Sequence, residues 1–492
     1  MEEALGQVPA TRIVTRNDEP VNGSGDFVLY WMIAYRRTGW NFALQRAADW
    51  ARDLRKPLLI LEALRCGHRW ASDRLHSFVI GGMAENARRL EGKPATYYPY
   101  VEPRQGAGKA LLAALADRAC IVVTDDYPAF MLPHMVKAAV QQLPVRLEQV
   151  DSNGLLPLRA ADRVFDRAYS FRRFLQRELP ENLLDFPDPD PLAAVGLPAP
   201  APLPEEIVRR WPVAPSGLLE GEGDALSAIP IDHTVQPVEM RGGSPAAEEA
   251  LKRFLDTRIE SYEEDRRHAD EEGASGLSPY LHFGHISSHQ VFAELMGCEA
   301  WNEQRLSPLS TGSRSGWWGV SSAAEAFLDQ LVTWRELGFN MCWQREDHDR
   351  YESLPAWASA TLAKHSRDAR PFRYSLDEYE GAKTHDPVWN AAQTQLIREG
   401  RIHNYMRMLW GKKVLEWSPS PQEALATMIE LNNKYALDGR DPNSYSGIFW
   451  VLGRYDRPWG PERPVYGTVR YMSSESTLKK THAREYLRRY SS

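Results

Sequence analysis

The hydrophobic pattern of this 492-residue chain changes its period once, and that change limits the fold more than any other sequence feature. Up to about residue 152, apolar strand-like runs alternate with helical segments. From about residue 246 onward, the apolar residues recur with the period of a helix. Such a chain is predicted to combine an α/β part with an all-α part.

Five apolar runs in the first part are predicted to be strands, at residues 27–33, 57–63, 96–102, 120–126 and 145–151. Helical candidates lie between them, around 41–55, 72–91, 106–118 and 130–142. Because strands that alternate with helices form parallel sheets, we predict a Rossmann-like, doubly wound parallel sheet. No GxGxxG follows the first strand, so this part need not bind a dinucleotide.

Residues 187–245 differ in composition from both neighbouring parts, since they contain PDPDP, LPAPAPLP, EGEGD and RGGSP. Abundant Pro, Gly and acidic residues are typical of a long surface connection, within which only 204–210 could form a helix. We therefore predict an α/β N-terminal domain at 1–186, an inter-domain linker at 187–245 and a helical domain at 246–492.

Composition limits the location and partners of the protein. No secretory signal and no run of 18 apolar residues are present, so we expect a cytoplasmic protein without a membrane span. The four cysteines form no CxxC pair, which predicts reduced thiols and no metal site. The net charge of −7 is unlike that of generally basic nucleic-acid binders, so any DNA binding would need a local basic face.

Four segments of the second half carry the chemical signals. In ASGLSPYLHFGHIS at 274–287, Ser278 is a predicted helix N-cap with Pro279 at the first helical position. Such a helix terminus suits a diphosphate, although a well-capped helix without a ligand has the same pattern. In YALDGRDPNSYSGIFW at 435–450, two acids flank a Gly–Arg pair, and an ordinary turn followed by a helix would look similar.

The other two segments are rich in tryptophan. Within 384–417, Trp410 and Trp417 lie seven residues apart and share a helix face, while Gly400 is predicted to break the helix after Trp389. Within 327–340, Trp334 follows an apolar helix face. Aromatic stripes of this kind also build ordinary helical cores. Basic residues interleaved with these aromatics also fit a rim that binds phosphates.

In this order, the segments resemble class II cyclobutane pyrimidine dimer photolyases, members of the photolyase/cryptochrome family. The resemblance rests on LSPYLHFGHIS, THDPVWNAAQ, YMRMLWGKKVLEW and NNKYALDGRDPNSYSGIFW, continued by DRPWG and VRYMS. It covers residues 250–475 closely and the N-terminal part loosely.

The resemblance implies FAD, folded in a U shape, inside the helical domain. Asp438 matches the acid that pairs with an arginine beside the isoalloxazine, and Arg407 matches that partner. Asn432 matches a side chain near flavin N5. The positions that match cofactor contacts are Tyr262, Leu277, Ser278, Arg407, Asn432, Asp438 and Asp441.

The resemblance also implies UV-damaged DNA as the partner of a monomeric enzyme, with the lesion flipped out of the duplex. Light-excited reduced FAD would donate an electron that splits the dimer and then returns. An electron relay is implied at Trp410, Trp389 and Trp417. The positions that match lesion contacts are Trp334, Met408, Trp450 and either Arg266 or Arg267. A deazaflavin or folate antenna in the N-terminal domain stays open.

One departure from the family concerns a glutamate that hydrogen-bonds the dimer. Gln330 occupies that position, and an amide can donate a hydrogen bond but supplies no proton. We expect lesion binding to survive and repair to fall, unless a shift of one residue brings in Asp329. Two other functions stay open: a cryptochrome-like blue-light receptor with FAD and the relay, and a nucleic-acid-binding flavoprotein without photochemistry.

Overall fold

In the part of the chain that the structure describes, six strands form one sheet in the order β1-β6-β5-β2-β3-β4. Their bounds are β1 (Ile13–Thr15), β2 (Phe27–Met32), β3 (Leu58–Leu64), β4 (Thr96–Val101), β5 (Ala119–Asp125) and β6 (Leu147–Val150). Every neighbouring pair is parallel except β1 and β6. The predicted doubly wound sheet is confirmed. The antiparallel edge strand β1 was not predicted, because three residues are too few to show a period.

The helices between the strands begin and end close to their predicted positions. They are α1 (Phe42–Leu54), α2 (Asp73–Leu90), α3 (Leu111–Ala116) and α4 (Leu132–Val140). Side chains of Asn41 and Ser72 cap α1 and α2. The prediction for α3 was too long at its start, because Gly106 and Ala110 both have positive φ and cannot lie within a helix.

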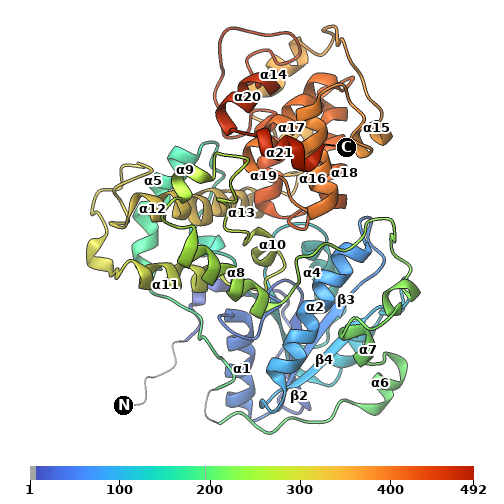
Figure 1. Ribbon diagram of the computed structural model, residues 1–492. Coiled ribbons are helices and arrows are strands. Elements are labelled where there is room, and N and C mark those ends of the chain that lie inside the picture. The colour runs from blue at the N-terminus through green and yellow to red at the C-terminus, as the bar shows by residue number, and fades with distance from the viewer. Residues whose placement is uncertain (1–6, 194–195, 492) are drawn as a thin grey trace. The chain divides into compact units, whose positions relative to one another are not determined.

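The structure, a computed structural model, describes residues 7–193 and 196–491 (Figure 1). Its contacts define two compact units. The first runs through Ala160 and adds Glu178–Lys252 and Leu277–Gly297. The second comprises Ala161–Arg177, Arg253–Gly276 and the chain from Cys298 onward. Each unit combines separated stretches of sequence, whereas the predicted domains are continuous. The domain boundaries at 186 and 245 therefore stay a prediction.

The described part of the 187–245 segment packs as part of the first unit. It forms the short helices α6 (Glu205–Arg210) and α7 (Ser216–Leu219). Its apolar side chains Trp211 and Ile229 are 3% and 4% exposed. Ile229 joins a core cluster with residues of β3, β4 and α2. The segment is therefore anchored at several buried positions.

The second unit is helical. Its elements that bear on function are α9 (Tyr262–Asp265), α12 (Ser322–Leu328), the π-helical turn η6 (Asp329–Trp334), α13 (Arg335–Gln344), α16 (Pro387–Glu399), α17 (Asn404–Trp417), α18 (Pro421–Tyr435) and α19 (Pro442–Val451). Figure 1 shows α16, α17 and α18 packed side by side. Gly400 ends α16 with φ +68°, which confirms the predicted break. Among the described residues, no helix is long and apolar enough to span a membrane.

Candidate functional site

The DGRDP segment forms a tight turn between α18 and α19, and Arg440 holds it closed. Arg440 has φ +68° and is 2% exposed. Its guanidinium donates to the carbonyl oxygens of Asn433, Ala436 (3.3 Å) and Leu437 (3.0 Å). These carbonyls lie at the C-terminal end of α18, where a helix leaves its acceptors without helical partners. The arginine therefore ties the turn to the end of α18, the helix that precedes it.

This turn places an acid, a cation and an amide close to the junction of α17, α18 and α19. Asp438 accepts from Arg407 of α17 at 3.2 Å, and both side chains are largely buried. Asn432, near the end of α18, is 3% exposed and donates from Nδ2 to Oγ of Ser444 at 2.8 Å. The predicted Arg407–Asp438 pair is thus present in the structure.

Three other predicted cofactor contacts lie at helix starts. Asp441 is the N-cap of α19, and its side chain accepts from the N–H of Asn443 at 2.8 Å. Leu277 and Ser278 belong to the first unit. The prediction of Ser278 as an N-cap was wrong by one residue: α10 (Ser278–His282) begins at Ser278, and the cap position is Leu277. Pro279 is the second residue of the helix, so the helix begins one residue earlier, at Ser278, than the proline rule alone predicts.

Tyr262 and the two candidate phosphate-binding arginines lie on and beside the short helix α9. The Tyr262 ring is 7% exposed and contacts the ring of Phe254 at 5.5 Å. Arg266 is half-buried, with its guanidinium 5.5 Å from the centre of the Tyr262 ring. Arg267 is exposed and lies 4.0 Å from Glu263. The two arginines therefore differ: only Arg266 is held beside a predicted cofactor contact.

The three predicted relay tryptophans form one buried cluster. The rings of Trp389 and Trp410 are nearly parallel, with an interplanar angle of 8° and centres 6.4 Å apart. Trp417 lies 6.0 Å from Trp389. All three are at most 2% exposed. The sequence placed Trp410 and Trp417 on one face of α17, and the reversal of the chain at Gly400 brings Trp389 to them.

The cluster continues toward solvent beyond Trp417. The ring of Tyr374 lies 5.4 Å from Trp417, and the imidazole of His385 lies 5.2 Å from it. Tyr374 is half-buried and His385 is exposed. Aromatic rings therefore extend from the buried Trp410 to the protein surface.

The predicted lesion contacts Trp334, Met408 and Trp450 are half-buried. Trp334 ends the π-helical turn η6, a helix distortion that occurs frequently at functional sites. Met408 and Gly447 approach each other between α17 and α19, since a Cβ at Gly447 would lie 3.9 Å from Cε of Met408. Trp450 lies one turn beyond Gly447 on the same helix. Lys412 lies with Nζ 5.0 Å from the centre of the Trp450 ring.

Gln330 and Asp329 differ in their surroundings. Asp329 forms a buried ion pair with Arg172, whose Nε and Nη2 lie 2.9 and 2.6 Å from its Oδ1. Gln330 is half-buried in the first turn of η6. Since its carboxylate is already held by Arg172, Asp329 is a poor substitute for a carboxyl group that would face a ligand.

The first unit holds a buried carboxylate that the sequence did not reveal. Asp125, at the end of β5, accepts from the backbone N–H groups of Ile33 (2.8 Å), Ala34 (2.6 Å) and Tyr35 (2.9 Å). It also accepts from the hydroxyl of Tyr30 at 2.6 Å. The strand order reverses between β2 and β5, where doubly wound sheets usually bind ligands. In this chain, the backbone N–H groups at that position donate to the carboxylate of Asp125.

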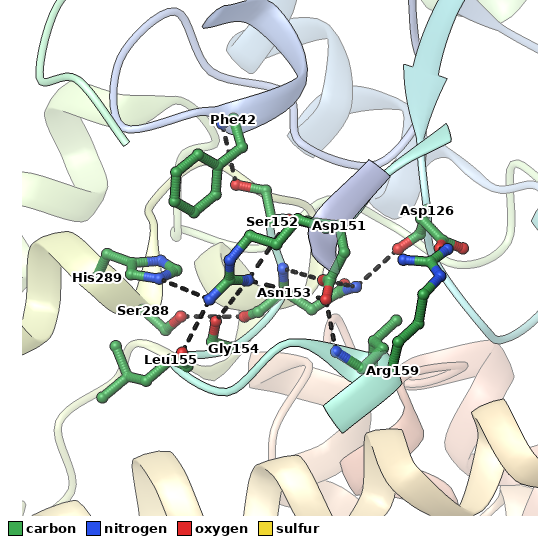
Figure 2. Close-up of polar contacts among 12 residues, drawn as sticks. Phe42, Asp126, Asp151, Ser152, Asn153, Gly154, Leu155, Arg159, Ser288 and His289 are labelled. Carbon is green, nitrogen blue, oxygen red and sulfur yellow. Dashed lines mark hydrogen bonds and ion pairs between the residues drawn. The ribbon is translucent and has the colours of Figure 1, made fainter. Parts of the chain in front are cut away.

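A second polar cluster lies at the ends of β5 and β6 (Figure 2). Arg12 is fully buried and donates to the carbonyl oxygens of Gly154 (3.2 Å) and Leu155 (2.8 Å). Asp126 is paired with Arg159, yet burial raises the pKa of Asp126 to about 6. Arg12 lies outside the predicted elements and Asp126 is the last residue of a predicted strand, so nothing in the sequence indicated that either belongs to a polar cluster.

Comparisons with known proteins agree with the two-part architecture. No family model matches the chain. Over 98% of both chains, it is 32% identical to the deoxyribodipyrimidine photo-lyase of Methanothermobacter thermautotrophicus. The deoxyribodipyrimidine photo-lyase of Oryza sativa subsp. japonica is 34% identical over 94% of this chain and 87% of its own length.

Two solved structures are similar in fold. A bacterial class III photolyase from Agrobacterium tumefaciens superposes with a TM-score of 0.65 at 17% identity, over 100% of this chain and 88% of its own. A cryptochrome from Synechocystis gives a TM-score of 0.68 at 14% identity, over 94% and 88%. The sheet and the helical unit therefore define the photolyase/cryptochrome fold. At 32% and 34% identity over nearly the whole length, the chain belongs to the deoxyribodipyrimidine photo-lyase family of enzymes.

Proposed function

We propose that this enzyme repairs cyclobutane pyrimidine dimers in DNA by light-driven electron transfer, as a class II photolyase. The observation that carries the proposal is the buried cluster of Trp389, Trp410 and Trp417, with ring centres 6.0 and 6.4 Å apart. Trp410 lies three residues beyond Arg407 on α17 and therefore shares its helix face. A row of oxidisable rings thus leads to a buried ion pair.

The residues around that ion pair fit FAD. A flavin ring presents both a donor N–H and acceptor oxygens on one edge, and Asp438 with Arg407 offers an acceptor and a donor side by side. Asn432 adds a buried amide. Tyr262, whose buried ring packs against Phe254 and Phe327, is a further flavin contact that we propose from the resemblance alone. When bound and photoexcited in its reduced state, FAD supplies the electron that splits the dimer. Arg407, Asp438 and Asn432 would orient the ring and set the charge around it.

The lesion would be held between aromatic side chains. Base flipping is the established route by which photolyases reach a base in a duplex. Trp334 and Trp450 are half-buried, so each can offer a ring face to an extruded dimer, and Met408 offers a polarisable side chain beside them. We assign the lesion phosphate to Arg266, since Arg267 lies among carboxylates on the surface.

Gln330 would donate a hydrogen bond to the dimer without supplying a proton. We predict that Gln330→Glu raises repair per absorbed photon by up to about tenfold, the worth of one charge-assisted hydrogen bond. The measurement is loss of dimers per photon at saturating substrate, with binding affinity measured in parallel as the control. An unchanged yield would show that Gln330 does not limit turnover.

The deciding experiment exposes the purified, flavin-loaded protein to dimer-containing DNA in light and in darkness. We expect dimers to disappear only in light, and the Trp450→Ala variant to retain flavin but bind the lesion more weakly. Flavin binding without repair would favour a cryptochrome-like receptor, the reading that Gln330 supports. We further propose that the enzyme is a cytoplasmic monomer, with a deazaflavin or folate as the candidate antenna.

A further inference from the structure

Trp410 has its indole N–H held by a single side chain. Its Nε1 donates to Oε1 of Gln393 on α16 at 2.9 Å. Gln393 is 0% exposed and Trp410 is 2% exposed, so the contact is sealed from solvent. Because an indole nitrogen can only donate, this contact fixes which end of the amide faces Trp410. The carbonyl oxygen of Gln393 is therefore directed at the ring.

The indole of Trp389 also donates to a neutral oxygen. Its Nε1 lies 3.0 Å from the backbone carbonyl oxygen of Trp410. The two residues sit in an apolar core cluster that includes Leu396, Leu409 and Val414. Both indole N–H groups thus meet an amide oxygen, which stabilises positive charge on its donor but is too weak a base to remove the proton.

We propose that Gln393 is a positioning residue for the electron relay, which holds the Trp410 ring and keeps the proton on its nitrogen while the ring is oxidised. The inference rests on the proposed function. With flavin bound and photoexcited, Trp410 would give up one electron to it, and the indole would become a radical cation. One electron from Trp389 would then restore neutral Trp410 with its N–H bond unbroken. The missing electron would now be on Trp389, and a transfer from Trp417 would move it on to Trp417.

The hydrogen bond gains strength when its donor carries charge, so its loss disfavours the oxidised ring more than the neutral ring. Gln393→Met keeps the length of the side chain and removes the acceptor. We expect the yield of separated tryptophan radicals to fall about five- to tenfold in this variant. Hole transfer from Trp410 to Trp389 in the unaltered protein should show no solvent deuterium isotope effect, since no proton moves.

Gln395→Met is the matched control. Gln395 lies on the same helix, is 6% exposed, and accepts from Tyr486 and from the N–H of His403 at 2.9 Å each. The variant therefore loses a buried glutamine of equal size outside the tryptophan contact. If Gln393 served stability alone, the two variants would behave alike.

Two readouts test the proposal, and the first needs no flavin. In nitrogen-15 spectra of the purified protein, the indole resonance of Trp410, assigned with Trp410→Phe, should move and exchange faster in Gln393→Met but not in Gln395→Met. In the flavin-loaded protein, flash absorption should show the fall in radical yield only in Gln393→Met. Equal behaviour of the two variants in flash absorption, or an isotope effect in the unaltered protein, would overturn the proposal. Should Trp410→Phe leave photoreduction of the flavin unchanged, the relay itself would fail instead.

Discussion

Asp125 in the first unit and Trp410 in the second are both buried polar side chains, but they differ in the number of hydrogen bonds that hold them. Asp125 accepts four hydrogen bonds, three of them from backbone N–H groups. Trp410 makes its indole hydrogen bond to one neutral amide. A carboxylate held on every side stabilises one geometry. A ring with one weak acceptor can change its charge, which is what electron transfer requires.

The largest effect on stability is expected from Asp125→Asn. The three backbone N–H groups all donate to Oδ2 and the Tyr30 hydroxyl donates to Oδ1, so an amide, with one oxygen, cannot accept from both sets of donors. The oxygen that remains is neutral and accepts more weakly than a carboxylate. We expect the free energy of unfolding to fall by about 3–5 kcal/mol, measured by denaturant titration. Asp18→Asn, at an exposed position, is the control. A loss below about 1 kcal/mol would mean that the carboxylate is not needed to fix the end of the sheet.

A smaller effect is expected from Arg440→Gln in the helical unit. The shorter amide cannot reach all three carbonyl oxygens at the end of α18, so the turn that carries Asp438 loosens. We expect a loss of about 2–3 kcal/mol, seen as a lower melting temperature, together with a lower flavin-to-protein absorbance ratio. Full flavin content in the variant would show that the turn does not position the cofactor site.

Lys412 should make stability depend on pH. Its ammonium is fully buried against Trp450 and donates to the carbonyl oxygen of Val451 at 2.6 Å. Burial lowers the pKa of Lys412 to about 7, with Asp456 opposing the shift and Arg470 adding to it. The unfolded chain keeps that proton up to about pH 10, so unfolding takes up a proton between about pH 7 and pH 10.

The free energy of unfolding should therefore rise with pH across that window, by at most about 1.4 kcal/mol per pH unit from this group. Lys412→Met should flatten the rise, measured by denaturant titration at several pH values. The exposed Lys479, replaced by Met, is the control and should leave the profile unchanged. Parallel profiles for all three proteins would contradict a lysine that loses its proton on folding.

The sequence predicted those features that rest on periodicity and on strong local signals. The five parallel strands, the break at Gly400 and the shared face of Trp410 and Trp417 all follow from spacing and backbone preference. Other features depend on packing or on groups that are far apart in the chain. They are the hydrogen bonds of Arg440, the hydrogen bonds around Asp125 and the π-helical turn η6. The contact between Gln393 and Trp410 is also of this kind, because the two residues lie on different helices. The resemblance therefore named Trp410 as a relay residue, whereas only the structure pointed to Gln393.

The central claim is that the buried tryptophans deliver electrons to the flavin, and Trp389→Phe tests it most directly. Phenylalanine keeps an aromatic ring but is smaller than tryptophan and lacks the N–H that donates to the Trp410 carbonyl, so we expect a loss of stability of about 2–3 kcal/mol. Light-driven reduction of the bound flavin should nevertheless fall at least tenfold, because benzene rings are far harder to oxidise than indoles. The measurement is the rate at which the oxidised flavin absorbance bleaches under blue light with an external reductant present. Bleaching at the rate of the unaltered protein, with flavin content equal, would contradict the claim.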